Sequence, residues 1–260
     1  MRLSAVIITR NEARHIRECL ESVSFADEIV VLDSGSTDET VKICREYGAR
    51  VELTDWPGFG PQKNRAIDLA QAEWVLSIDA DELVTPALRE EMIQAMAHPG
   101  EYVAFHMPRA SSYCGRIMRH GGWWPDHVIR LFRRGRGRFS DKRVHETLVV
   151  DGLVGELTQP LRHRSFVNLE EVLEKVNTYS SAGALQMLEN GKRGGLFKAV
   201  GHGLWSFVRT YFFRLGCLDG AEGLMLAISN AEGTYYRYVK RGLLDREAAD
   251  ANQCHRDDLQ

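Results

Sequence analysis

A short apolar run that ends in acidic residues constrains this chain more than any other feature. Residues 74–78, Trp-Val-Leu-Ser-Ile, are followed at once by Asp79-Ala80-Asp81-Glu82. An apolar, β-branched run of this length predicts a buried strand, and Thr85-Pro86 predicts the start of a helix soon after it. Ligands often bind where a parallel strand ends and the chain crosses to a helix. Two carboxylates on alternate residues there predict a site for Mg²⁺ or Mn²⁺, with an acidic helix entry as the alternative.

Strands and helices alternate through the first hundred residues. The pattern predicts strands at 3–9, 28–33, 50–53 and 74–78, and helices ending near 23 and covering 39–47, 61–71 and 85–97. Such alternation predicts an α/β fold with a doubly wound, mostly parallel sheet. Further strands are predicted at 102–109 and 128–133, and helical spacing begins after Asn168. We therefore expect one domain at 1–165 and a helical C-terminal extension at 166–260, its last helix reaching about Arg241 before a polar tail at 245–260.

Three strand ends carry polar motifs in a fixed order. They read Thr9-Arg10-Asn11-Glu12, Asp33-Ser34-Gly35-Ser36-Thr37-Asp38 and Asp79-Ala80-Asp81-Glu82, with Gly60-Pro61-Gln62-Lys63-Asn64-Arg65-Ala66 between the last two. This arrangement resembles the family 2 glycosyltransferases. A dinucleotide site or a phosphate loop is excluded, because the chain has no Gly-x-Gly-x-x-Gly after the first strand and no Gly-Lys-Ser/Thr.

The resemblance implies a GT-A-like fold and a set of donor-binding residues. The nucleotide of an activated sugar would be held by Thr9, Arg10, Glu12, Asp33, Ser34, Asp38, Lys63 and Asp79, and the metal by Asp81. Asp33 can accept a hydrogen bond from a pyrimidine N–H. A cation-bound diphosphate is a suitable leaving group, since its developing charge is already matched.

The segment 116–143 is rich in bases, with nine Lys and Arg against two acids. A solvated basic hairpin is one interpretation. The other is an acceptor-binding segment, in which Arg130 and Arg133 bind phosphate or carboxylate, Trp124 stacks on a sugar ring, and Asp126 contributes a polar contact.

A catalytic base is expected beyond the metal motif. Inverting transfer needs a carboxylate that removes the acceptor hydroxyl proton. Related transferases carry such a base after the metal motif, and Glu146 in Val-His-Glu occupies the matching place. Asp126 and Asp141 are the rivals, and a strand pair with exposed charges is the alternative without catalysis.

Residues 191–218 contain five bases and no acid among many aromatic residues. Such a segment predicts contact with an anionic membrane surface or packing within the protein. The net charge of −3 argues against a nucleic-acid binder. The five cysteines are scattered, and neither a signal peptide nor a stretch of 18 apolar residues is found. We therefore expect a cytoplasmic protein, peripheral at the inner face of the inner membrane if the segment binds lipid.

Within the family, the motifs together with Trp-Trp-Pro-Asp and Arg-Leu-Phe-Arg resemble transferases that add glucose to lipopolysaccharide inner-core heptose. That resemblance implies UDP-glucose as donor and the lipopolysaccharide core as acceptor. Three alternatives remain: transfer to a polyprenyl phosphate or another cell-envelope glycan, a sugar-1-phosphate nucleotidyltransferase, and a nucleotide-sugar-binding module without catalysis.

Overall fold

The computed structural model describes residues 2–140 and 147–257, which form two compact units. The first unit comprises residues up to 110 and residues 125–164, and the second comprises residues 111–124 and 165 onward. The expected division at residue 165 therefore needs one correction, because residues 111–124 belong to the second unit. Tyr113 and Met118 pack there in a small core with Val172 and Leu226.

The first four strands form the parallel half of the sheet. They are β1 (Leu3–Thr9), β2 (Glu28–Asp33), β3 (Arg50–Leu53) and β4 (Trp74–Asp79), in the order β3-β2-β1-β4. All residues of β1 are buried, and so are the first five of β4, as expected for strands covered on both faces. The α/β class, the mostly parallel sheet and the C-terminal helical extension are confirmed.

The sheet continues past β4 with mixed directions. Its further strands are β8 (Asp126–Arg133), β6 (Tyr102–Tyr113), β12 (Leu161–Phe166) and β5 (Glu82–Val84), with β11 (Leu153–Glu156) and β7 (Arg116–Ile117) paired to β6. β9 (Gly137–Phe139) and β10 (Leu148–Val150) form a separate pair. The sequence pattern does not predict β5, and β6 runs four residues beyond its predicted end at Arg109.

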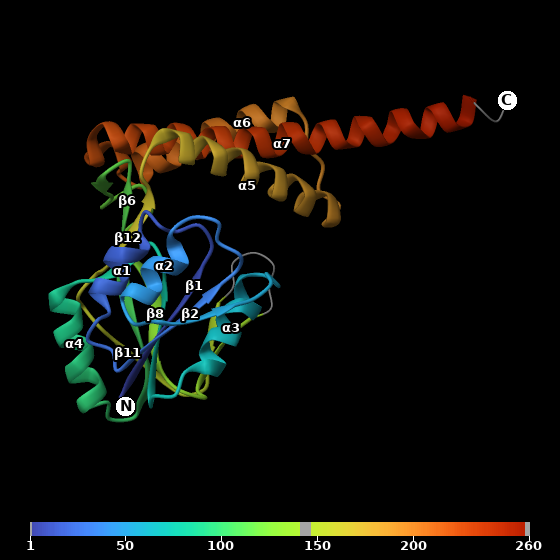
Figure 1. Ribbon diagram of the computed structural model, residues 1–260. Coiled ribbons are helices and arrows are strands. Elements are labelled where there is room, and N and C mark those ends of the chain that lie inside the picture. Colours follow the sequence, from blue (N-terminus) through green and yellow to red (C-terminus); the bar gives the residue numbers. More distant parts are fainter. Residues whose placement is uncertain (1, 141–146, 258–260) are drawn as a thin grey trace. The chain divides into compact units, whose positions relative to one another are not determined.

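Helices cover both faces of the parallel half (Figure 1). One apolar core joins that sheet to α1 (Ile16–Ser22), α2 (Thr40–Glu46) and α4 (Pro86–Ala97), and the other joins it to α3 (Phe59–Leu69) and to β9 and β10. The predicted start of α4 is confirmed, because the Thr85 hydroxyl accepts a hydrogen bond from the Leu88 N–H at 3.2 Å. The three strands β1, β2 and β4 are thus fixed from both sides.

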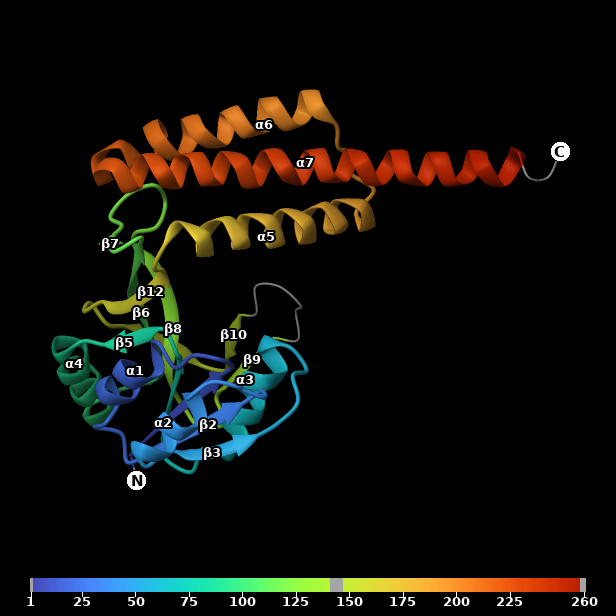
Figure 2. The ribbon, with the colours of Figure 1, turned by 45° about the horizontal axis from the view of Figure 1, so that its top comes forward.

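The second unit is mainly helical: α7 (Gly220–Asp257) lies between α5 (Leu169–Glu189) and α6 (Leu196–Val208) (Figure 2). A π-helical turn at Arg209–Phe213 and a 3₁₀ turn at Gly216–Asp219 join α6 to α7. The expected end of the last helix near Arg241 is wrong, since α7 continues to Asp257. No glycine or proline follows Gly242, and the later residues are mostly good helix formers. Among the described residues, no helix is long and apolar enough to cross a membrane.

Glycines let the α5–α6 connection cross α7 backbone to backbone. The Gly195 N–H donates a hydrogen bond to the Tyr238 carbonyl at 3.0 Å. A Cβ on Gly194 would collide with that carbonyl oxygen, and a Cβ on Gly242 would lie 2.9 Å from the Gly195 nitrogen. The crossing therefore requires residues without a side chain.

Candidate functional site

The ends of three neighbouring strands bring the predicted donor-binding motifs together. β1 lies between β2 and β4. Thr9 stands opposite Asp33 in the register, and Ile8 stands opposite Asp79. The loops that follow these strands therefore begin at one edge of the sheet, the usual place for a ligand in this architecture.

Asp33 is fully buried and organises the loop after β2. Its Oδ1 accepts hydrogen bonds from the backbone N–H groups of Gly35, at 3.0 Å, and Ser36, at 2.8 Å. Its Oδ2 accepts from the Thr9 hydroxyl at 3.0 Å and from the Ser36 hydroxyl. A pyrimidine N–H would have to replace one of these four bonds to reach the carboxylate.

Asn11 ties the loop after β1 to the loop after β2. Its N–H donates to the Ser36 hydroxyl oxygen at 2.8 Å, and its Oδ1 accepts from the Thr37 N–H at 2.8 Å. The residue has a φ of +56°, which asparagine tolerates better than most side chains. The sequence motif alone does not indicate this role of Asn11, because its hydrogen bonds join residues 25 and 26 positions apart.

Asp38 and Glu12 complete the connection between the two loops. Asp38 accepts hydrogen bonds from the Ala13 N–H at 3.1 Å and from the Thr40 N–H at 3.0 Å and hydroxyl at 2.5 Å. Desolvation raises the pKa of the Asp38 carboxyl, but these hydrogen bonds outweigh it and the net pKa is lowered. The Glu12 N–H donates to the same Thr40 hydroxyl oxygen at 2.8 Å. Asp38 therefore serves the loop as an ionised acceptor.

The remaining donor-binding candidates differ in exposure. Ser34 is buried, and its hydroxyl oxygen accepts from the Gln62 amide at 3.0 Å. Arg10 is exposed. Lys63 is buried on α3, and its ammonium lies 2.9 Å from Asp79 Oδ1. The lysine of the Gly60–Ala66 motif thus reaches the acidic end of β4.

A group of buried charges lies beneath the acidic motif. Arg130 Nη2 lies 2.6 Å from Asp79 Oδ2 and 2.7 Å from Glu82 Oε1, and the Glu82 side chain is fully buried. Glu82 Oε2 also accepts from the Asp79 backbone N–H at 3.1 Å. Desolvation raises the pKa of Asp79, yet Arg130 and Lys63 outweigh it and hold that pKa well below its usual value. Asp79 is therefore ionised, with each oxygen in an ion pair.

Asp81 has a different partner from its neighbours. It lies in the turn between β4 and β5, and its Oδ2 is 3.3 Å from Nε2 of His163 on β12. The antiparallel pairing of β12 with β5 brings His163 opposite Glu82. A carboxylate oxygen and an imidazole nitrogen at this separation form a donor pair that suits a divalent cation. The sequence alone does not indicate His163, because this residue stands 82 residues after Asp81 in no recognisable motif.

The acceptor-binding candidates are divided between the two units. Trp124 belongs to the second unit, whereas Asp126, Arg130 and Arg133 belong to the first. Asp126 Oδ2 accepts from Arg109 Nε at 2.9 Å and Nη2 at 2.6 Å.

The two arginines are both paired within the first unit. Arg133 lies 3.2 Å from Glu73 and over the Trp74 ring. Arg130 requires a correction, since its guanidinium is buried in the acid cluster and is not available to an incoming phosphate.

The predicted catalytic base Glu146 and its rival Asp141 lie outside the described residues. The flanking strands β9 and β10 pair antiparallel, with Leu148 opposite Phe139. Both roles therefore stay predictions.

The strand-end motifs that form this site also lie in the part of the chain that is similar to known proteins. The family model described as "Glycosyl transferase family 2" matches residues 4–150, more than half of the chain, and this span contains all three strand-end motifs. The chain belongs to glycosyl transferase family 2. This glycosyltransferase shares 33% identity over 256 residues with "Lipopolysaccharide core biosynthesis glycosyltransferase LpsC" of Rhizobium meliloti, covering 91% of this chain and 93% of that one. An uncharacterized glycosyltransferase of Rickettsia felis is 29% identical, covering 92% and 89%.

Two solved structures resemble the glycosyltransferase more distantly. Glucosyl-3-phosphoglycerate synthase from Mycobacterium tuberculosis, in complex with Mn²⁺, UDP-glucose and phosphoglyceric acid, is 26% identical with a TM-score of 0.36, covering 44% of each chain. The match thus spans less than half of that enzyme. Residues 1–349 of S. aureus TarS give a TM-score of 0.48 at 16% identity, covering 94% of this chain and 92% of that one.

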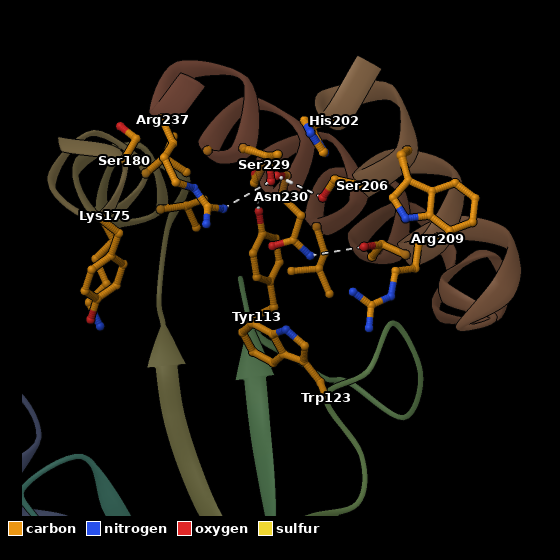
Figure 3. A pocket seen from close by; sticks show the side chains of 18 of the residues that line it. Tyr113, Trp123, Lys175, Ser180, His202, Ser206, Arg209, Ser229, Asn230 and Arg237 are labelled. Atoms are coloured by element: carbon orange, nitrogen blue, oxygen red, sulfur yellow. Dashed lines mark hydrogen bonds between the residues drawn. The ribbon is translucent and has the colours of Figure 1, made fainter. Parts of the chain in front are cut away.

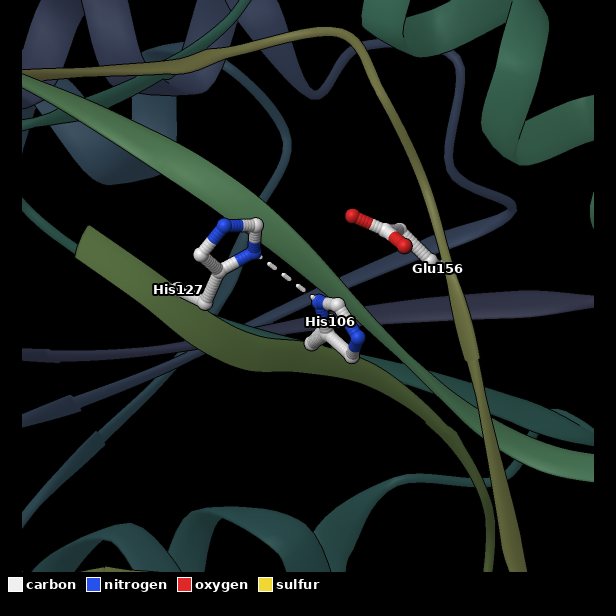
Figure 4. Close-up of side chains that lie close together, drawn as sticks. All are labelled: His106, His127 and Glu156. Carbon is white, nitrogen blue, oxygen red and sulfur yellow. Dashed lines mark hydrogen bonds between the residues drawn. The ribbon is translucent and has the colours of Figure 1, made fainter. Parts of the chain in front are cut away.

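Three side chains that have the spacing of metal ligands lie elsewhere in the first unit of the glycosyltransferase (Figure 4). His106 on β6, His127 on β8 and Glu156 on β11 place one ligand atom each within 4.8 Å of the others. The two Nδ1 atoms are 3.1 Å apart. His127 and Glu156 are exposed, and none of the three belongs to a strand-end motif. A substitution in this group is therefore a suitable control for substitutions of Asp81 and His163.

Proposed function

We propose that this protein is an inverting hexosyltransferase that moves glucose from UDP-glucose onto the heptose of the lipopolysaccharide inner core. The observation that carries the proposal is its similarity, over nearly the whole chain, to the R. meliloti glycosyltransferase, whose name places it in lipopolysaccharide core biosynthesis. The donor is a nucleotide sugar, as family membership implies, and glucose follows from the resemblance of the motifs to glucose-adding core transferases.

The donor-binding proposal rests on the joined loops after β1 and β2. Thr9, Arg10, Glu12, Asp33, Ser34 and Asp38 all lie in or beside these loops. Asn11 and Asp38 hold the two loops together before any ligand arrives. A pre-organised pocket loses less entropy on binding, which supports the assignment of UDP to this edge of the sheet.

The metal proposal assigns Mg²⁺ or Mn²⁺ to Asp81 and His163. Asp79 is a poorer ligand, because Lys63 and Arg130 already occupy its two oxygens. Mg²⁺ favours oxygen ligands, whereas an imidazole nitrogen raises the relative affinity of a transition ion. The pair therefore favours Mn²⁺. When bound, the ion would neutralise charge on the leaving diphosphate.

Glu146 is the proposed base, although it lies outside the described residues. Single displacement needs one carboxylate on the acceptor side, and the product would be β-linked from an α-linked donor. Asp126 is a weaker candidate, because Arg109 holds its Oδ2 with two hydrogen bonds.

The membrane proposal concerns α6 and the turns that follow it. Leu196, Phe197, Val200, Leu204 and Trp205 are large apolar side chains of α6 that are all more than half exposed, and Phe197 is 95% exposed. Lys198 lies on the same helix, and no acid occurs between residues 191 and 218. Exposed apolar groups beside bases suit the interface of an anionic membrane. This supports peripheral contact with the inner face of the inner membrane.

Transfer assays with a defined donor and acceptor panel test the function. Purified protein would be incubated with Mn²⁺, radiolabelled UDP-glucose, UDP-galactose or ADP-glucose, and lipopolysaccharide from truncated-core strains. We expect label to enter only heptose-terminated acceptors from UDP-glucose, with an Asp81→Asn variant inactive and an Asp68→Asn variant, changed on the surface of α3, fully active. Label transferred to polyprenyl phosphate, or to none of the acceptors, would refute the proposal.

A further inference from the structure

A cavity of about 550 Å³ lies entirely within the second unit (Figure 3). Residues of α5, α6, α7 and the segment 111–124 line it. Ligand pockets in proteins measure about 300–1,000 Å³. The cavity is thus large enough for a small ligand, and none of the three strand-end motifs contributes to it.

The permanent charges on the residues that line this cavity all have one sign. Four permanent cations line it: Lys175, Arg209, Arg214 and Arg237. No aspartate or glutamate is among the lining residues. Within the described part of the chain, none of these four cations forms an ion pair with a carboxylate, although Arg116 and Arg241 of the same unit do. The lining therefore carries a positive charge that is not paired directly with a carboxylate and that favours an anion.

Aromatic side chains supply flat apolar walls. Tyr113, Trp123 and Phe166 contact one another, with ring centroids 5.7–6.1 Å apart. Trp205 of α6 also lines the cavity. Aromatic walls beside cations suit a sugar ring with a charged substituent, because the ring's C–H face packs on aromatic carbon while the anion meets the cations.

Polar groups between these walls are held in fixed positions. The Tyr113 hydroxyl lies 2.9 Å from the Ser229 hydroxyl. The Asn230 amide donates to the Thr210 hydroxyl oxygen at 3.4 Å. Such hydroxyl and amide groups can exchange hydrogen bonds with the hydroxyls of a saccharide.

Gly122 leaves room for one of the cations. It has a φ of +87°, and a Cβ placed on it would lie 2.9 Å from both Cδ and Cζ of Arg214. The neighbouring Gly121 N–H donates to the Arg214 carbonyl at 2.8 Å. A side chain at position 122 would displace the guanidinium, so the segment 111–124 positions Arg214 at the cavity.

We propose that this cavity binds an anionic saccharide, a sugar ring carrying phosphate. The binding of a phosphorylated sugar is independent of the proposed function. The identification of that sugar as the phosphorylated part of the acceptor rests on the proposed function. The same chemistry is offered by a free sugar phosphate and by a phosphorylated core glycan, and the test separates the two.

Calorimetry on the full chain measures binding directly. The probes are glucose 6-phosphate, glucose, inorganic phosphate, and a delipidated phosphorylated core oligosaccharide before and after dephosphorylation with hydrogen fluoride. We expect the phosphorylated oligosaccharide to bind at least tenfold more tightly than its dephosphorylated form, and glucose 6-phosphate more tightly than glucose or phosphate alone. Binding of glucose 6-phosphate without any preference for the oligosaccharide would assign the cavity to a free sugar phosphate. Equal binding of phosphorylated and dephosphorylated forms would overturn the proposal.

Matched variants locate the site. Arg237→Met keeps the aliphatic stem that packs against Gly183 and removes the charge, whereas Lys192→Met removes a charge outside the lining. Arg237→Met should lower the affinity for phosphorylated ligands about tenfold, because a charge-assisted hydrogen bond is lost. The affinity for UDP and the thermal stability should be unchanged. Lys192→Met should leave all three quantities unchanged.

Kinetics distinguish failure of this proposal from failure of the proposed function. If the enzyme transfers glucose, Arg237→Met should raise the KM for the phosphorylated acceptor and leave the KM for UDP-glucose unchanged. If no acceptor is glucosylated but the oligosaccharide still binds in a manner sensitive to Arg237→Met, the cavity assignment stands and the proposed function falls. Equal oligosaccharide binding by wild type, Arg237→Met and Lys192→Met would refute the cavity assignment alone.

Discussion

Replacing Arg130 by methionine should destabilise the protein far more than removal of an exposed arginine. In the folded protein the guanidinium lies 2.6 Å from Asp79 and 2.7 Å from the fully buried Glu82. Methionine keeps much of the side-chain volume but removes one cationic partner from each of two carboxylates. Asp79 keeps its ion pair with Lys63, and Glu82 keeps its ion pair with Arg109 at 3.4 Å. Removing one partner of a buried ion pair costs about 3–5 kcal/mol. Because each acid keeps one cationic partner, we expect Arg130→Met to lower the free energy of unfolding by about 3 kcal/mol at pH 7.

The matched control is Arg136→Met. Arg136 lies 2.8 Å from Asp151, nearly the same distance, but both side chains are more than half exposed. Exposed ion pairs contribute at most about 1 kcal/mol. Because the ion-pair distances are similar, a difference in stability between the two variants reports the effect of burial.

Chemical denaturation at several pH values gives the free energy of unfolding for both variants. Asp79 has a lowered pKa in the folded state. It therefore contributes stability that is present above its unfolded pKa of about 3.9 and lost as pH falls. In Arg130→Met the pKa of Asp79 is lowered less. The loss in free energy of unfolding relative to wild type should therefore be largest near neutral pH and become smaller toward pH 3. Adding Glu82→Gln should recover part of the loss, because it removes a buried charge. A loss at pH 7 no greater than that of Arg136→Met would refute the reasoning.

Three further outcomes are expected. Asp81→Ala and His163→Ala should each abolish Mn²⁺-dependent turnover, measured as UDP release, while His106→Ala leaves the metal dependence unchanged; equal effects of all three would place the ion elsewhere. Glu146→Gln should lower kcat about 10²–10⁴-fold with the UDP affinity unchanged by calorimetry, and activity within a few-fold of wild type would exclude Glu146 as the base. Asp33→Asn should weaken UDP binding about tenfold and, by loosening its loop, increase amide hydrogen exchange there; equal calorimetric affinity of wild type for UDP and ADP would oppose the pyrimidine contact.

The strands and helices that local patterns specify could be predicted from sequence. β1, β2 and β4 are apolar runs bounded by polar residues, and Thr85 caps α4 as its residue type indicates. Their adjacency follows from the parallel winding rule, so the meeting of Thr9, Asp33 and Asp79 was predictable as well.

Long-range partners could not be predicted in the same way. The basic residues of 116–143 looked like one cationic face, but Arg130, Arg136 and Arg138 each pair with an acid from another part of the chain. His163 meets Asp81 only because β12 pairs with β5, and β5 has three residues and no clear signal. Charge counted along the sequence does not reveal which charges are neutralised in space.

The backbone crossing at Gly194, Gly195 and Gly242 has a consequence for engineering this protein. In a library that substitutes every position, substitutions at these glycines should be depleted among folded variants although the glycines lie away from the deepest core. A Cβ on Gly194 or Gly242 would separate the α5–α6 connection from α7, and Gly195 has a φ of +128°, which other residues rarely adopt. Gly201 of α6 offers the contrast, because a Cβ there has no heavy atom within 4 Å. Alanine at Gly201 should raise stability by about 0.5–1 kcal/mol, so the same residue type marks both a position to protect and a position to improve.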